Sequence, residues 1–222
     1  MNTRARSREE WLRLLATTTE GHLHGERPEV AYDTASEIIE RAGAAGLWRE
    51  GDTILDIGCG NGRLAIPLTT RDVCYIGVEP IAGCVEFCKR VFAPWPNFRF
   101  IHVDLKNECY NPRGTLDPFE FVFPVDDHSV DTILFGSVFT HLGTLEVCMH
   151  YLDETLRVLK RGGRVGCSWF RSPPHAVSGD TSRTVFRETD IINLLKRFRV
   201  LHTEGGLTDG YHDQWVMMLQ KP

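Results

Sequence analysis

The amino-acid sequence predicts an α/β fold: a doubly wound, mostly parallel sheet with helices on both faces and an antiparallel hairpin strand at its C-terminal end. Two observations lead to this prediction. Short apolar runs typical of buried parallel strands alternate along the chain with segments whose apolar residues recur at helical spacing. The chain has 222 residues, of which 42% are hydrophobic and 25% charged, so a single core of ordinary composition can form. We therefore expect one domain, 1–222, with an N-terminal helical cap (1–50), a core (51–170) and a C-terminal helix with an edge hairpin (171–222).

The first half of the chain is expected to form two helices, followed by alternating strands and helices. Apolar side chains three and four apart predict the helices, and short apolar runs that end in glycine or a polar residue predict the strands. Pro67 should shorten or kink the third helix, because proline has no amide proton to donate. In order, we expect helices at 8–18 and 28–45, strand 53–57, helix 61–70, strand 74–78, helix 81–92 and strand 98–103.

The second half continues this alternation and then ends in two strands without a helix between them. A turn-rich segment, Gly205–Gly210, separates these last strands, which favours an antiparallel hairpin at the edge of the sheet. In order, we expect strand 130–135, helix 144–160, strand 164–169, helix 188–198 and strands 199–204 and 215–220.

Two segments are longer than an ordinary connection between a strand and a helix. The first, 105–124, follows the third predicted strand, and the second, 171–187, follows the fifth. Because ligands of open α/β sheets bind at the carboxyl ends of the strands, we expect both segments to form walls of a ligand site. The first segment carries aromatic residues suited to stacking on an apolar face of a ligand, namely Tyr110, Phe119, Phe121 and Phe123.

Composition disfavours several classes of partner. A net charge of -5 and a pI near 6.0 leave no basic excess for nucleic acid or an anionic membrane, which favours a small molecule. The seven cysteines are scattered and form no C-x-x-C pair, as is typical of a reducing compartment. No apolar stretch reaches the roughly 18 residues of a membrane span and no signal peptide is apparent, so we expect a cytoplasmic protein. A homodimer is left open.

The strongest local signal is a glycine-rich turn after the first predicted strand, which reads LDIGCGNGR from Leu55 to Arg63. Glycine lets the backbone adopt positive φ and approach a ligand closely, and the N-terminus of a following helix offers amide protons to negative charge. Glu79 stands at the end of the next strand, where a carboxylate accepts hydrogen bonds from a ribose diol. The pattern indicates a cofactor that contains a nucleoside.

Two side chains at this turn indicate which nucleoside cofactor is bound. Arg63 stands where the dinucleotide fingerprint G-x-G-x-x-G has its third glycine, and Asp56 lies two residues before the first glycine. A carboxylate there would repel a pyrophosphate but suits a cationic sulfonium and ammonium. At these residues the sequence resembles the class I S-adenosylmethionine-dependent methyltransferases, over about residues 53–170. The resemblance implies a Rossmann-like doubly wound sheet, S-adenosyl-L-methionine as the cofactor and S-adenosyl-L-homocysteine as the product.

The resemblance also assigns roles to individual residues. Residues 56–62 look like the methionine-binding loop, Glu79 with Pro80 looks like the ribose clamp, and Asp104 with Leu105 looks like the pair beside adenine. The cofactor-binding residues predicted in this way are Asp56, Gly58, Cys59, Gly60, Gly62, Glu79, Pro80, Asp104, Leu105, Gly136 and Ser137.

His141 is the predicted catalytic residue. It belongs to 136–142, which resembles the segment that passes under the sulfonium, while 151–163 resembles the family's helix and glycine turn before the fifth strand. A hydroxyl acceptor must lose its proton, and neutral imidazole is the base best matched to pH 7. The alternative for His141 is a structural ring that packs on the following helix.

These observations predict methyl transfer from S-adenosylmethionine to a small molecule, with a hydroxyl oxygen of a sugar or natural product as the first choice. The segment 105–124 resembles a bacterial subgroup associated with polysaccharide or natural-product pathways. N-methylation of a small amine stays open, as does a catalytically silent, cofactor-binding regulatory or scaffold domain. The charge and the lack of an added domain disfavour a nucleic-acid or protein methyltransferase.

No metal site is predicted. His22 and His24 lack a third ligand nearby in the sequence and fit an N-terminal lid better. Residues 126–128 precede a strand and fit a solvated turn, and Tyr211–Asp213 fits a loop of the terminal hairpin.

Overall fold

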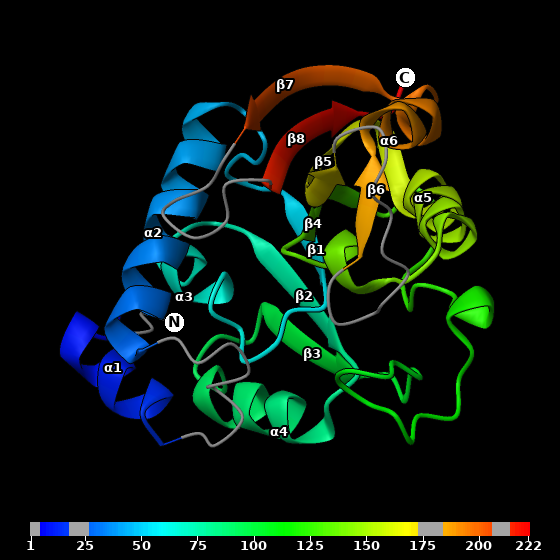
Figure 1. Cartoon of the computed structure of the whole chain (residues 1–222). Helices are drawn as coiled ribbons and strands as arrows, with labels where there is room; N and C mark the ends of the chain where they lie inside the picture. Colours follow the sequence, from blue (N-terminus) through cyan, green and yellow to red (C-terminus); the bar gives the residue numbers. More distant parts are fainter. Residues whose placement is uncertain (1–4, 18–26, 173–183, 206–213) are drawn as a thin grey trace. The chain divides into compact units, whose positions relative to one another are not determined.

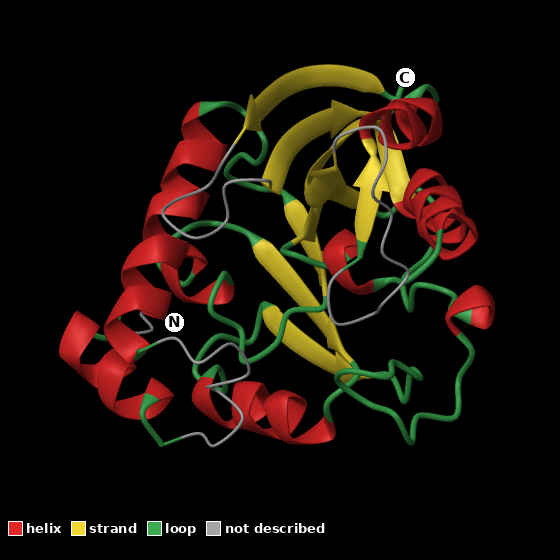
Figure 2. Ribbon diagram, in the orientation of Figure 1, coloured by secondary structure: helices red, strands yellow, loops and turns green. Residues whose placement is uncertain are grey.

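The computed structural model describes residues 5–17, 27–172, 184–205 and 214–222 (Figure 1). Contacts within the chain divide it into two compact units, Met1–Val103 and Asp104–Pro222. In the described parts of both units the strands pair mostly in parallel, and antiparallel strand pairs involve only the last two strands of the chain (Figure 2). This is the sheet that the sequence predicts. The single domain expected over 1–222 stays a prediction.

The first unit combines parallel strands with helices. Its elements are α1 (Arg8–Leu15), α2 (Pro28–Ala44), β1 (Thr53–Ile57), α3 (Ala65–Leu68), β2 (Cys74–Glu79), α4 (Ala82–Val91) and β3 (Phe98–His102). The strand order is β3-β2-β1, with both pairs parallel and in unbroken register. Since parallel strands end at the same edge of a sheet, Asp56 of β1 and Glu79 of β2 are brought to that edge.

The sequence accounts for the helices at the N-terminus of the first unit. Ser7 caps α1, because its Oγ accepts a hydrogen bond from the Glu10 amide at 3.2 Å and Glu10 Oε2 accepts one from the Ser7 amide at 2.7 Å. α2 begins at Pro28, where the missing amide proton costs no helical hydrogen bond. Trp11 of α1 is buried and stacks on Trp95, with ring centroids 5.8 Å apart. Capping and aromatic packing therefore both hold α1 in place.

The helix after the glycine-rich turn is much shorter than predicted. The sequence predicts a helix over 61–70, whereas α3 covers only Ala65–Leu68 and turns precede it. Gly62 has a φ of 76°, outside the right-handed helical region, so the helix begins only after it. Pro67 limits the helix further because it donates no hydrogen bond. The glycine-rich turn is consequently a loop over its whole length.

The second unit contains a mixed set of strands. Its elements are η2 (Pro118–Glu120), β4 (Val130–Phe135), η3 (Phe139–His141), α5 (Leu145–Val158), β5 (Leu159–Ser172), β6 (Val185–Arg187), α6 (Glu188–Leu195), β7 (Arg199–Gly205) and β8 (Gln214–Gln220). The strand order is β4-β5-β8-β7, and β6 also pairs with β5. β4 and β6 run parallel to β5, while β8 is antiparallel to both β5 and β7. The predicted C-terminal hairpin pairing is thus confirmed.

Two features of the second unit differ from the prediction. α5 ends at Val158 and β5 begins at the next residue, well before the strand start expected at 164. Gly162 has a φ of 74°, and the register of β5 against β4 shifts across this region, so the strand continues through the glycines as an irregular stretch. β6 is not predicted, because three residues are too few to show the alternation of a strand.

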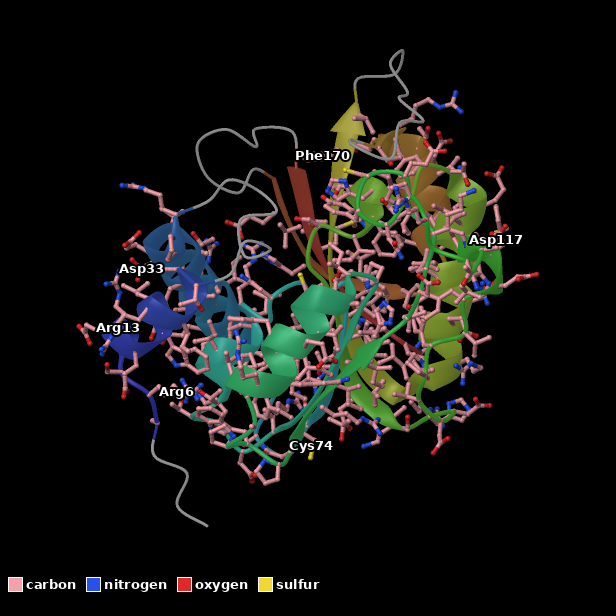
Figure 3. All side chains as sticks on the ribbon, turned by 90° about the horizontal axis from the view of Figure 1, so that it is seen from below. Arg6, Arg13, Asp33, Cys74, Asp117 and Phe170 are labelled. Carbon is pink, nitrogen blue, oxygen red and sulfur yellow. The ribbon has the colours of Figure 1, made fainter. Side chains whose placement is uncertain are left out.

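The aromatic residues of 105–124 do not form the wall expected of them. Phe121 and Phe123 are 2% and 1% exposed and pack near Tyr151 of α5, with ring centroids 5.7 and 5.6 Å from it. Burying these rings removes more apolar surface from water than an open site would allow, so they join the core. Phe119 is exposed, close in sequence to Asp117 at the periphery in Figure 3. Of the four, Tyr110 contacts a predicted site residue, His141.

Several sequence-based expectations fall on parts of the chain that the structure does not describe. His22, His24, Tyr211–Asp213 and residues 173–183 of the expected second wall lie outside the described residues. In the described ranges, no helix is long and apolar enough to cross a membrane. Within the same ranges, no group of three or more His, Cys, Asp or Glu side chains is arranged to hold a metal ion.

Candidate functional site

The glycines of the glycine-rich turn in the first unit differ in why the position requires glycine. Gly58, Gly60 and Gly62 have φ values of 73°, 55° and 76°, in the left-handed region that side chains other than glycine rarely adopt. A Cβ placed on Gly62 would lie 2.8 Å from the Phe92 ring, so glycine is required there for packing. A Cβ on Gly60 would meet nothing within 4 Å. The backbone of Gly60 therefore borders open space, as a loop that receives a ligand should.

Asp56 carries a buried carboxylate that the described protein does not fully satisfy. Its side chain is 1% exposed, and Oδ2 accepts a hydrogen bond of 2.5 Å from the Tyr75 hydroxyl. Oδ1 has no hydrogen-bond partner among the described residues. Burial raises the pKa of Asp56 to about 7. A buried acceptor without a donor is costly, so this oxygen suits a ligand that brings a cation or an N–H group.

Glu79 ties the turn to the end of β2. Its Oε2 accepts a hydrogen bond from the Gly60 amide at 2.9 Å, and Oε1 accepts one from the Ile81 amide at 3.0 Å. The residue is 5% exposed, and burial raises its pKa to about 7 in spite of these two bonds. Pro80 follows at the strand end, and its carbonyl lies 3.1 Å from Nε2 of His102. Glu79 thereby fixes the position of Gly60.

Cys59 has a packing role within the turn. An added Cβ on Gly77 of β2 would lie 2.7 Å from the Cys59 sulfur, so the thiol fills the space above that glycine. A hydrogen bond with Cys88 and burial both raise the pKa of Cys59 well above its ordinary value. Thiols in this state are poor nucleophiles. The environment of Cys59 therefore suits packing rather than reaction.

Two buried carboxylates and an open stretch of backbone make the turn suitable for S-adenosylmethionine. Asp56 offers an unsatisfied negative oxygen for a cationic group, and Gly60 leaves room for close approach of a ligand to the backbone. Glu79 supplies a second buried carboxylate at the end of the neighbouring strand. These features agree with the predicted binding of the cofactor at this turn, which stays a prediction.

In the second unit, Asp104 organises the segment that follows β3. Its Oδ1 accepts a hydrogen bond from Asn111 Nδ2 at 3.0 Å, and its Oδ2 accepts bonds from the Thr115 hydroxyl at 2.8 Å and the Thr115 amide at 3.2 Å. The buried Leu105 accepts a further bond from Asn111 through its carbonyl. The structure thus gives Asp104 a structural role that the sequence did not reveal, while contact of Asp104 and Leu105 with adenine stays a prediction.

The chain after β4 adopts a constrained conformation. Ser137 has a φ of 62°, which is uncommon for a residue other than glycine, and its amide donates to Ser168 Oγ at 3.1 Å. The Thr140 hydroxyl donates to the Ser137 carbonyl. Strained residues held by their surroundings cluster at ligand-binding sites. The placement of Gly136 and Ser137 beside the cofactor stays a prediction that this conformation supports.

His141 ends η3 and meets the segment 105–124. Its Nε2 lies 3.1 Å from the Tyr110 hydroxyl, and the two rings meet edge to face with centroids 5.1 Å apart. Asn107 Nδ2 donates to the His141 carbonyl at 3.0 Å. The adjacent Thr140 carbonyl accepts a bond of 2.7 Å from the amide of Thr184, the residue just before β6. Sequence reasoning missed Tyr110, Asn107 and Thr184 as neighbours of this histidine, since no spacing pattern links them.

The family of the chain follows from comparison with known proteins. Residues 54–163 match the model of a family described as a methyltransferase domain. This range includes the glycine-rich turn, Glu79, Asp104 and His141. The chain therefore contains a methyltransferase domain over these residues. The match confirms the enzyme class that the sequence predicts and agrees with the predicted cofactor.

Individual relatives of this methyltransferase are distant. A demethylmenaquinone methyltransferase from Clavibacter sepedonicus is 29% identical over 156 residues, which cover 65% of this chain and 55% of that protein. The chain therefore spans only about half the length of this curated relative. The crystal structure of Burkholderia thailandensis 1,6-didemethyltoxoflavin-N1-methyltransferase, with its substrate and S-adenosylhomocysteine bound, has a TM-score of 0.64 and 18% identity, covering 100% of this chain and 93% of that one.

A second solved structure gives the same result. Magnesium protoporphyrin IX methyltransferase from Synechocystis PCC 6803, with S-adenosylmethionine bound, has a TM-score of 0.62 and 18% identity, covering 96% of this chain and 90% of that one. At these identities the likeness establishes the fold of the methyltransferase and leaves its acceptor open. The predicted Rossmann-like, mostly parallel sheet is confirmed.

Proposed function

We propose that the methyltransferase transfers a methyl group from S-adenosylmethionine to a small molecule, with a hydroxyl oxygen of a sugar or natural product as the acceptor. The observation that carries the proposal is the buried Asp56 carboxylate, which has an oxygen without a donor and stands in the strand that leads into the turn with the open backbone of Gly60. A cationic ligand would satisfy that oxygen and lower the cost of burying the charge. S-adenosylmethionine, when bound, supplies a methyl group on a cationic sulfonium sulfur.

The cofactor contacts that the sequence predicts are retained in this proposal. Asp56 pairs with the positive charge of the methionine portion, and Glu79 accepts hydrogen bonds from the ribose while it holds the Gly60 amide. The family resemblance supports Asp104 and Leu105 as contacts of adenine. The remaining proposed contacts are Gly58, Cys59, Gly60, Gly62, Pro80, Gly136 and Ser137.

His141 is proposed to take the proton of the acceptor. Methyl transfer is an in-line displacement, so holding the reacting atoms in contact supplies most of the rate enhancement. A hydroxyl group is a weak nucleophile until it loses its proton, and a positioned base adds about 10² to 10⁴ in rate. The half-buried His141, with its ring held against Tyr110, is the base that the second unit offers. A hydroxyl acceptor needs a base to remove its proton, whereas an unprotonated amine does not. A positioned histidine therefore favours an oxygen acceptor.

The cellular setting is part of the same proposal. The scattered cysteines favour a cytoplasmic location, and the net charge of -5 favours a small-molecule partner over nucleic acid. Whether the methyltransferase forms a homodimer is a separate question, which light scattering of the purified protein answers.

The test is a screen of acceptors with the purified protein and isotope-labelled S-adenosylmethionine. Sugars, phenols and aliphatic hydroxyl compounds are compared with amines of similar size, and the methylated products are detected by mass spectrometry. The proposal predicts labelled ethers, and replacement of His141 by Gln should reduce their formation about 10² to 10⁴-fold. The matched control is His150→Gln, since this histidine lies on α5 with Nε2 bonded to the Phe121 carbonyl.

The screen separates the alternatives by product. Methylated amines without ethers would assign the enzyme to nitrogen and refute the proposed acceptor. Cofactor binding with no turnover of any acceptor, and none with water over long incubation, would indicate the silent regulatory domain.

A further inference from the structure

We propose that Tyr110 is the group through which the acceptor's proton reaches His141. The inference rests on the proposed methylation of a hydroxyl group. It adds a second catalytic residue to the reaction, one that comes from the segment 105–124 and that the sequence motifs of the family do not include.

The geometry of the two rings places the Tyr110 hydroxyl on a ring nitrogen of His141. The oxygen lies 3.1 Å from Nε2, and the planes of the rings are 85° apart. A phenol is a better donor than acceptor, and a neutral imidazole nitrogen is a strong acceptor. The favoured arrangement is therefore a bond from the Tyr110 O–H to Nε2, with the imidazole proton on Nδ1. In this arrangement the lone pair of Nε2 is engaged by Tyr110.

A single side chain holds both residues of the pair. Asn107 Oδ1 accepts hydrogen bonds of 3.0 Å from the amides of Tyr110 and Cys109, while Asn107 Nδ2 donates to the His141 carbonyl at 3.0 Å. The same amide group therefore fixes the backbone of Tyr110 and the backbone of His141. This fixed relation is what a proton path between two side chains requires.

The rest of the loop is built to present Tyr110 in one position. Asn107 and Asn111 exchange backbone hydrogen bonds of 3.1 and 2.8 Å, which closes the turn that contains Tyr110. Asp104 ties down Asn111 and Thr115, as described above. A Cβ on Gly114 would lie 2.5 Å from the Leu105 carbonyl oxygen, so the loop closes tightly on its own base. Tyr110 is thus carried by an ordered structure with its hydroxyl directed at His141.

The proposed step balances in protons and electrons. The acceptor O–H proton passes to the Tyr110 oxygen, while the proton of Tyr110 passes to Nε2 of His141, which becomes an imidazolium. The electron pair of the broken acceptor O–H bond forms the new O–CH₃ bond, and the pair of the S–CH₃ bond returns to sulfur. Tyr110 ends the step neutral, and His141 later releases its extra proton to water.

The tautomer of His141 tests the pair without any acceptor. Protein labelled with ¹⁵N in its histidine rings, in the presence of S-adenosylhomocysteine, is compared by long-range ¹H–¹⁵N spectroscopy with the Tyr110→Phe variant. We expect the Nδ1–H form of His141 in the wild type and a shift toward the Nε2–H form in the variant. His150 is the internal control, because its Nε2 lies 2.9 Å from the Phe121 carbonyl, which only accepts hydrogen bonds. An Nε2–H form of His141 in the wild type, or the same form in both proteins, would overturn the inference.

Activity then separates this inference from the proposed function. With a hydroxyl acceptor from the screen, Tyr110→Phe should lower kcat about 10² to 10⁴-fold and leave the Kd of S-adenosylhomocysteine unchanged. If His141→Gln abolishes turnover but Tyr110→Phe does not, the path through Tyr110 is refuted and the base remains. If neither variant slows turnover, the proposed role of His141 as the base is refuted as well. Thermal unfolding of each variant checks that the loss is not one of folding.

Discussion

The replacement Asp56→Asn should make the free protein more stable at neutral pH and at the same time lower its affinity for the cofactor about 10- to 150-fold. The substitution deletes a buried negative charge and keeps an oxygen that accepts the hydrogen bond from the Tyr75 hydroxyl. Few variants in a folded core are expected to gain stability while losing function. The combination is expected here because one oxygen of this buried carboxylate, Oδ1, has no hydrogen-bond donor among the described residues and is proposed to bind the cofactor.

The magnitude follows from the pKa of Asp56. Burial raises this pKa from 3.8 to about 7, which corresponds to an upper bound of about 4 kcal/mol. Because the folded protein holds the Asp56 proton more tightly than the unfolded chain, the contribution of Asp56 to stability is greatest below about pH 4 and is lost as the pH rises through 7. About 2 to 3 kcal/mol of this loss should occur between pH 5 and pH 8. The variant lacks this loss, although its unpaired amide group costs about 1 to 3 kcal/mol at every pH.

Urea unfolding of the variant and the wild type at pH 5 and at pH 8 gives the difference in their free energies of unfolding at each pH. We expect that difference to move in favour of the variant by about 2 to 3 kcal/mol on going to pH 8. The control is Asp33→Asn, where an ion pair of 2.7 Å with Arg8 holds the pKa of the carboxyl below its ordinary value. This carboxyl is charged at both pH values in the folded and the unfolded chain, so the stability difference of the control should not change between pH 5 and pH 8. A stability difference for Asp56→Asn that is the same at both pH values would refute the reasoning.

The remaining predictions concern the turn. Gly60→Ala and Gly62→Ala should each cost about 1 kcal/mol of stability, because both positions have a positive φ. Only Gly62→Ala also places a Cβ 2.8 Å from the Phe92 ring, so its melting temperature should fall further than that of Gly60→Ala. Calorimetry should show the larger loss of cofactor affinity for Gly60→Ala, and the opposite ranking would contradict the roles assigned. Glu79→Ala should weaken binding by about 1.5 to 3 kcal/mol in the same assay, and an unchanged Kd would exclude it from the ribose. Affinity should also fall as the pH drops below 7, where Asp56 and Glu79 take up protons; a Kd constant from pH 8 to 5.5 would count against both carboxylates.

The surroundings of the glycine-rich turn could be predicted because the residues concerned are neighbours in sequence or end adjacent strands. Asp56 and Glu79 stand near the ends of two strands that any βαβ unit pairs in parallel. The sequence did not distinguish Gly60 from Gly62, since both show the same pattern, and only the packing of Phe92 separates them. The sequence pattern also did not predict that α3 begins only after Gly62 and is four residues long.

The surroundings of His141 could be predicted only in part. His141 was found by its place after the fourth strand, but Tyr110 and Asn107 reach it from a loop more than thirty residues earlier, and no local periodicity records such a contact. Phe121 and Phe123 were expected to face a ligand and instead fill the core beside Tyr151, because burial of an aromatic ring depends on the tertiary structure. β6 has three residues, too few for the alternation of apolar and polar residues that predicts a strand.

The buried carboxylate of Asp56 is proposed to make the glycine-rich turn a site for a cationic nucleoside. Calorimetric titration of the purified protein with S-adenosylmethionine and, separately, with NAD measures this preference. We expect micromolar binding of S-adenosylmethionine, loss of about 10- to 150-fold in affinity in Asp56→Asn, and no binding of NAD. Binding of NAD alone, or S-adenosylmethionine affinity that survives Asp56→Asn unchanged, would contradict it.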